Sequence, residues 1–93
     1  MISPEVLARY AADAAREVGG VHGLVGRNDG VRVSREGGRV AVELHLALEW
    51  GANAATVGPA VQEHVAECLV RMADVRPDSV DVVVDEWHSA SPA

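Results

Sequence analysis

The stretch Arg39–Gly51, RVAVELHLALEWG, decides the fold because its apolar and polar residues alternate almost without interruption. The even-numbered positions from 40 to 50 are all apolar, whereas the odd-numbered positions include Glu43, His45 and Glu49. Side chains of a β-strand point alternately to the two faces of its sheet. The alternation therefore predicts a long strand with one buried face and one face in water.

The bulk composition predicts an acidic cytoplasmic protein. The 93 residues fit one domain, expected over residues 1–88, with a flexible C-terminal tail at residues 89–93. The net charge is −6, which disfavours nucleic acid and direct membrane insertion because phosphates and anionic headgroups are repelled. Cys68 is the only cysteine and has no partner for an internal disulfide, and we recognise no signal peptide.

The residues before the alternating stretch predict a helix and a further strand. The segment SPE at residues 3–5 is typical of a helix N-terminus, and apolar residues then recur at spacings of three and four. Residues 31–35 alternate like a strand, and the EGG segment at residues 36–38 predicts a hairpin turn. Residues 21–25 fit either a short strand or a buried turn.

The residues after the alternating stretch predict a second helix and a last strand. Apolar residues recur about every fourth position from Val57 to Met72, after a helix start at Asn53 or, more comfortably for Pro59, at Thr56. The last strand follows at residues 79–88, and the crossover helix makes it parallel to residues 39–50. The predicted fold is an α+β two-layer sandwich in the order helix, strand, strand, helix, strand. Both helices cover one face of a three-stranded sheet.

Several short motifs occur in an order that is informative as a set. They are ISPEV at residues 2–6, GGV and GL at residues 19–21 and 23–24, EWG followed by Asn53 at the strand exit, and VQE with Val65 in the second helix. With the closing strand, this order resembles the alkaline shock protein family, also called the Gls-type envelope stress response proteins. The resemblance covers residues 2–86.

The resemblance implies a small, non-enzymatic bacterial protein linked to cell-envelope stress. Some members self-assemble and sit at the cytoplasmic side of the membrane through a membrane-anchored partner. The resemblance therefore implies a homo-oligomer, and a small membrane-anchored relative as a further partner. The family has no catalytic or cofactor-binding motif to carry over to this chain.

Glu43 and His45 are the first candidates for a metal site. They are two residues apart on the expected strand, so their side chains point the same way, and Asp81 or Asp85 offers a third ligand if the strands are close. No other His or Cys has the spacing of a metal ligand. We therefore expect Glu43 and His45 to face solvent, with no bound metal.

His64 and Cys68 border the apolar stripe of the second helix. We expect both to pack there, because no nucleophile is placed with a base and an orienting carboxylate. The Gly-rich segment GGVHGLVG follows a helix instead of preceding one, so it does not predict a phosphate loop. The sequence therefore predicts neither an enzyme nor a bound cofactor.

The two tryptophans are the better indication of function. They end two strands that run in the same direction, so both belong near one end of the sheet. By parity Trp50 points inward, and Trp87 lies on the outer face unless a bulge shifts it. An outward Trp87 either folds against the residues after it or joins an apolar patch for protein contact. The predicted interaction residues are Glu43, His45, Ala47, Val83, Asp85 and Trp87.

We interpret the chain as a non-catalytic interaction protein that associates with itself or with a membrane-anchored partner through the outer sheet face and a strand edge. The alternative is a metal or iron–sulfur cluster assembly or carrier domain, since similar small domains serve that role. That alternative needs an exposed cysteine, whereas Cys68 is expected to be buried. An RNA-binding domain of similar layout needs a basic groove and a GXXG loop between two helices, and we expect neither.

Overall fold

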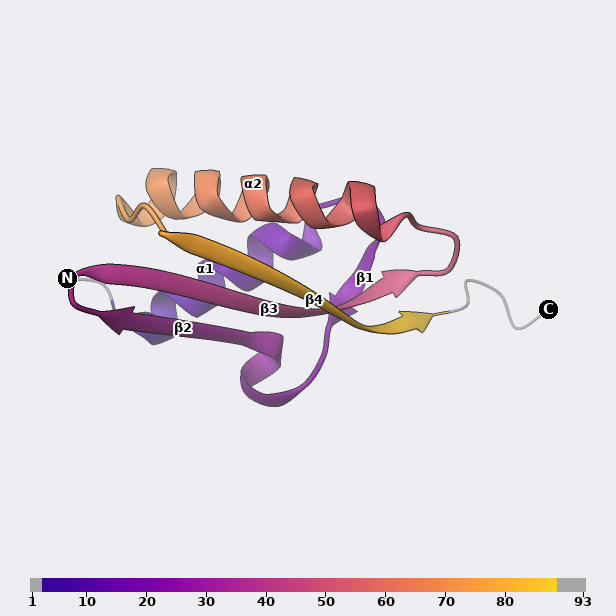
Figure 1. The fold of residues 1–93 in the computed structure, drawn as a ribbon, viewed down its shortest axis with the longest axis horizontal. Helices are drawn as coiled ribbons and strands as arrows, with labels where there is room; N and C mark the ends of the chain where they lie inside the picture. The colour runs from indigo at the N-terminus through magenta and orange to yellow at the C-terminus, as the bar shows by residue number, and fades with distance from the viewer. Residues whose placement is uncertain (1–2, 89–93) are drawn as a thin grey trace.

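The computed structural model describes residues 3–88, and the expected tail at residues 89–93 lies outside them. The elements are helix α1 (Pro4–Arg16), strand β1 (Val21–Leu24), a short 3-10 helix (Arg27–Gly30), strands β2 (Val31–Glu36) and β3 (Arg39–Glu49), helix α2 (Ala54–Ala73) and strand β4 (Ser79–His88). Figure 1 shows α1 behind the strands and α2 along the β4 side. The predicted α+β class is confirmed.

β3 is the central strand and pairs with each of the other three. β2 and β1 follow one another along one side of β3 and are antiparallel to it, whereas β4 lies on the other side and is parallel. The parallel pair confirms the predicted crossover through α2. The predicted number of three strands is wrong, because β1 pairs with the end of β3 through Val21 with Leu48 and Leu24 with Leu46.

The buried face of β3 forms the floor of the core, as its alternation predicts. Val42, Leu44, Leu46 and Leu48 are almost completely inaccessible to solvent. The two helices pack against this floor and against each other. They contribute the buried residues Leu7, Ala11, Ala12, Ala14 and Ala15 of α1 and Val57, Val61, Val65 and Leu69 of α2.

Side-chain caps begin both helices. The Ser3 hydroxyl accepts from the Val6 N–H at 3.3 Å, and the Asn53 side chain accepts from the Ala55 N–H at 2.9 Å. Of the two predicted starts for α2, the structure therefore uses Asn53, and Pro59 lies inside the helix. The cap satisfies a backbone N–H that has no partner within the helix, which favours the earlier start.

Gly30 makes the tight entry into β2 possible. Its φ is +78°, a conformation that L side chains rarely adopt, and an added Cβ would lie 2.8 Å from the Val25 carbonyl oxygen. A glycine is therefore required between the short 3-10 helix and β2.

Asp78 fixes the start of β4 against the start of β3. Its N–H donates to the Val40 carbonyl at 2.7 Å, and its carboxylate accepts from the Val40 N–H at 2.7 Å. One residue thus satisfies both backbone polar groups of the buried Val40. This double contact helps to set the register in which Val42 pairs with Val80.

We predict that Asp78→Ala lowers the free energy of unfolding by about 1–3 kcal/mol, because it leaves the Val40 N–H without its charged acceptor. Urea denaturation of the variant and the wild type measures the difference. Glu63→Ala removes an exposed carboxylate from α2 and is the control, with a change of about 0.5 kcal/mol or less. Equal losses in the two variants would contradict the assigned role of Asp78.

Candidate interaction surface

A β-bulge in β4 decides which face each of its last residues occupies. Val84 pairs with Leu46 and Glu86 pairs with Ala47, so Asp85 is an extra residue in the strand. Beyond the bulge, Trp87 pairs with Leu48 and shares the sheet face that carries the helices. The parity prediction that places Trp87 on the outer face is therefore wrong, because the bulge shifts the alternation by one residue.

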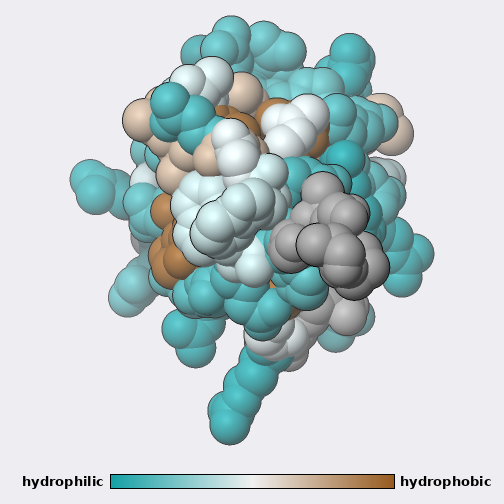
Figure 2. Space-filling model, turned by 90° about the vertical axis from the view of Figure 1, so that its right-hand side faces the viewer, coloured by the Kyte–Doolittle hydropathy of each residue, from teal (hydrophilic) through white to brown (hydrophobic). Residues whose placement is uncertain are grey.

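Trp50 and Trp87 lie at the end of the sheet where α2 begins, and both are exposed. Trp50 is 69% exposed and Trp87 is 45% exposed. The predicted inward orientation of Trp50 is wrong, because β3 ends at Glu49 and Gly51, at φ +91°, turns the chain away. Figure 2 looks onto this end and shows pale and brown surface between hydrophilic side chains. We call this region, defined by Trp50 and Trp87, the tryptophan end.

Ala47 does not belong to any accessible patch. It is 0% exposed, and its Cα partners on the two neighbouring strands are Gly23 and Glu86. The apolar patch expected on the outer face, of Ala41, Ala47, Val83 and Trp87, therefore does not form as predicted, because Ala47 is buried and Trp87 lies on the other face, whereas Val83 is 38% exposed.

His45 links β3 to β4 on the outer face of the sheet. Its Nδ1 lies 2.6 Å from the Asp85 carboxylate and its Nε2 lies 2.7 Å from the Glu43 carboxylate. A neutral imidazole has one N–H, so both contacts are donated only by the protonated ring. The hydrogen bonds with Glu43 and then Asp85 raise the pKa of His45 above its usual value. Glu43, His45 and Asp85 thus form one cross-strand bridge.

A second histidine cluster lies further along the same face. The rings of His22 and His88 are stacked, with centroids 4.1 Å apart and an interplanar angle of 9°. His88 Nε2 lies 3.0 Å from the Glu86 carboxylate, and His22 Nδ1 lies 3.9 Å from that of Glu49. Sequence reasoning missed this cluster. The cluster could have been predicted from the parallel pairing of β3 and β4, which places Glu49 opposite His88. It also required residues 21–24 to be assigned to a strand.

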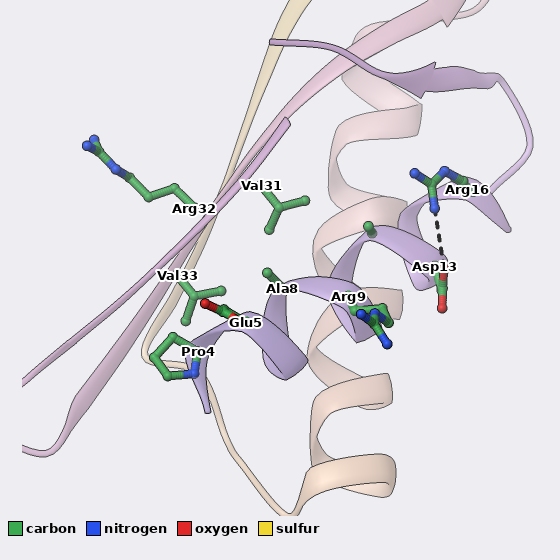
Figure 3. Close-up of a pocket in the computed structure, with 10 residues that line it drawn as sticks. Pro4, Glu5, Ala8, Arg9, Asp13, Arg16, Val31, Arg32 and Val33 are labelled. Carbon is green, nitrogen blue, oxygen red and sulfur yellow. Dashed lines mark hydrogen bonds and ion pairs between the residues drawn. The ribbon is translucent and has the colours of Figure 1, made fainter. Parts of the chain in front are cut away.

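The helix side of the molecule carries an open groove of about 620 Å³ between α1 and β2. Figure 3 shows Val31 and Val33 pointing toward α1, whereas Arg32 points to the opposite side of the sheet. Arg16 on the groove wall pairs with Asp13 at 3.2 Å. A smaller hollow of about 360 Å³ adjoins Glu43 and His45 on the outer side.

Cys68 and His64 pack on the side of α2 that faces α1. The half-buried Cys68 thiol lies 3.7 Å from the Tyr10 carbonyl, and burial raises the pKa of this thiol. His64 Nε2 lies 2.7 Å from the Glu17 carboxylate just after α1. A raised thiol pKa lowers the fraction of thiolate, which is the metal-binding form of cysteine. Among the side chains that the structure describes, which exclude those of residues 28–29, no three of His, Cys, Asp or Glu are grouped so as to hold a metal ion.

Over residues 1–88 the chain matches the alkaline shock protein 23 family, which is described by a cell envelope-related function. The chain belongs to this family. The match confirms the resemblance found in the motifs along the sequence. No curated protein matches the chain in sequence. In the described part of this family member, no helix is both long and apolar enough to cross a membrane.

Several solved structures share the fold of this alkaline shock family member. A substituted MamM CTD has 20% identity and a TM-score of 0.69, covering 88% of this chain and 90% of that chain. A second MamM CTD variant has 16% identity and a TM-score of 0.63, over 96% and 100% of the two chains. A manganese form has 18% identity and a TM-score of 0.60, over 88% and 96%. These similarities establish the fold.

The His45 bridge makes the stability of this alkaline shock family member depend on pH. Folding raises the pKa of His45, so the bridge contributes fully below the unfolded value of 6.5 and is lost as pH rises through the higher folded value. Because solvent screens an exposed pair, we expect a loss of about 0.5 kcal/mol or less between pH 6 and the alkaline range.

Urea denaturation at a series of pH values measures this loss. His45→Gln removes the titrating ring and should give a flatter dependence than the wild type above pH 6. A wild type whose stability rises over that range, with the variant following it in parallel, would contradict the assignment.

Proposed function

We propose that this chain is a non-catalytic interaction protein of the bacterial cell envelope, which self-associates and docks on a small membrane-anchored partner. It would then be cytoplasmic and peripheral to the inner face of the membrane. Membership of an envelope-related family supports the setting. The observation that carries the interaction role is the tryptophan end.

Exposed tryptophans are unusual features of a protein surface and common anchors of protein contacts. Tryptophan buries a large apolar area with little loss of side-chain freedom, which is why it is enriched among the residues that dominate binding. Trp50 directly follows β3, and Trp87 lies in the neighbouring strand β4. The Trp50 N–H donates to the His88 carbonyl at 2.6 Å, which ties the two chain segments to each other.

The non-catalytic part of the proposal rests on what the reactive side chains do in the fold. Cys68 is half-buried beside the Tyr10 carbonyl, and His64 faces Glu17 instead of a nucleophile. His45 has a carboxylate at each ring nitrogen. Each of these groups links one element of the fold to another. The raised pKa and partial burial of Cys68 also weigh against a cluster carrier, which would need an accessible thiolate.

Docking at the envelope predicts that the protein is recovered with membranes from its native cells. Trp50→Ala combined with Trp87→Ala should move most of it to the soluble fraction, because two apolar anchors are lost. Met72→Ala is the matched control, since Met72 is 54% exposed but lies at the far end of α2. Immunoblots of the fractions give the distribution. Wild type found wholly in the soluble fraction would contradict the envelope role.

Self-association predicts that light scattering of the purified chain gives a mass above 9.8 kDa that rises with concentration. The double tryptophan variant and Met72→Ala show whether the tryptophan end makes that contact as well. A mass that stays at the monomer value over the whole concentration range would contradict self-association.

A further inference from the structure

β2 forms one edge of the sheet over residues 31–36. It pairs with β3 on one side, and within the described residues no strand lies on its other side. Figure 1 shows β2 below β3, in the half of the sheet away from the start of α2. An edge strand presents backbone N–H and C=O groups that can pair with a strand of another chain.

The backbone of Val31 and Val33 points to that open side. In an antiparallel pair, opposed residues alternate between those that exchange two hydrogen bonds and those that exchange none. Val40 is of the second kind, because both its backbone groups bind Asp78 at 2.7 Å, and its partner Arg35 therefore directs its backbone groups away from β3. Val33 and Val31 precede Arg35 by two and four residues. By the same alternation, each offers a donor and an acceptor to a further strand.

The outer side chains of β2 carry charges of both signs. Arg32, Ser34 and Glu36 alternate with the inner residues and point away from the helices, as Figure 3 shows for Arg32. All three are exposed, and in the described part of the chain neither Arg32 nor Glu36 forms an ion pair. Arg32 lies opposite Glu43, but that carboxylate contacts His45 instead. The open edge therefore presents one positive and one negative charge, four residues apart.

We propose that β2 pairs with the β2 strand of a second copy in antiparallel orientation, with Ser34 of the two copies directly opposite each other. The inference rests on the self-association in the proposed function and names its surface. In this register Arg32 of each copy lies opposite Glu36 of the other, which gives two cross-strand ion pairs. Val33 then lies opposite Arg35 of the other copy, and the direction of their backbone groups lets them exchange hydrogen bonds. A shift by two residues would place Arg32 opposite Ser34 or bring the two Arg35 residues together, so charge complementarity selects this register.

The long edge on the other side of the sheet is unsuited to the same pairing. β4 carries three carboxylates and no Lys or Arg, so two copies of β4 would bring like charges together. The bulge at Asp85 interrupts its alternation, and the Gln62 side chain on α2 donates to the Val80 carbonyl at 2.8 Å. Bulges, charges and covering groups protect edge strands from pairing with other chains. β2 has a regular register with β3 and charges of both signs.

The β2 edge and the tryptophan end lie in different halves of the sheet. β2 pairs with β3 from Arg39 to Leu44, whereas Trp50 follows the last residue of β3. One chain can therefore use both surfaces at the same time. Pairing through β2 gives a dimer with two-fold symmetry, and the tryptophan end remains for further copies or for the anchored partner.

Thiol cross-linking tests the register. Ser34→Cys is made in a Cys68→Ala background, so that each chain has one thiol. Opposed residues that exchange no hydrogen bonds have Cα atoms about 4.5 Å apart, within the range of a disulfide, so mild oxidation should give a covalent dimer. Glu63→Cys in the same background places an exposed thiol on α2 and should run as a monomer on a non-reducing gel. Cross-linking of both variants to the same extent, or of neither, would overturn the proposal.

A charge exchange tests the ion pairs, with sedimentation equilibrium of the whole chain as the measurement. Arg32→Glu should raise the dissociation constant of the dimer about tenfold, because two opposite-charge pairs become two like-charge pairs. Adding Glu36→Arg restores opposite charges and should return the constant to within about threefold of the wild-type value. Arg71→Glu makes the same change of charge on α2 and is the control, with a change of about twofold or less.

Equal dimerisation of the wild type and Arg32→Glu would overturn the proposal, as would a double variant no better than the single one. If association that depends on the tryptophans persists in that case, the proposed function stands and only the assignment to β2 falls.

Discussion

The row of apolar side chains along one face of β3 is the constraint on which the rest of the structure depends. Val42, Leu44, Leu46 and Leu48 must leave water, and both helices pack against this row to cover it. Because strand side chains alternate, burying these four residues forces Glu43 and His45 to the opposite face. The core and the polar outer face with Glu43 and His45 are thus two consequences of one alternating strand.

The bulge in β4 modifies this scheme at one end of the sheet. It places Asp85 beside His45 and still lets Trp87 join the helix face next to Leu48. A regular strand would put Asp85 and Trp87 on the same face. The inserted residue therefore puts the charged Asp85 and the apolar Trp87 on opposite faces of the sheet, although they are only two residues apart in the chain. Bulges are frequent where a strand must redirect a side chain for function.

The fold class followed from the sequence because its main elements carry strong periodic signals. The apolar spacing of α2 fits only a helix, and the alternation of β3 fits only a strand. The crossover through α2 then makes β4 parallel to β3. β1 was left open because four residues containing a glycine have too little pattern to distinguish a strand from a turn. The sequence left the start of α2 open between Asn53 and Thr56, and the cap at Asn53 outweighs the cost of Pro59 inside the helix.

The candidate surface was only partly predictable. The outward orientation of Glu43 and His45 follows from parity and is correct. The faces of Trp50 and Trp87 were wrong, because parity fails where a strand ends or bulges, and neither event has a reliable local signal. The stacked His22 and His88 lie on strands far apart in the chain, so only the sheet register could bring them together.

Intrinsic tryptophan fluorescence tests the central claim most directly, since Trp50 and Trp87 are the only tryptophans in the chain and both lie at the end assigned to protein contact. Emission and acrylamide quenching are followed as the purified protein is concentrated into assemblies. The account predicts water-exposed emission for the free monomer, with a blue shift and reduced quenching on association. Association that leaves both signals unchanged would place the contact elsewhere and contradict the account.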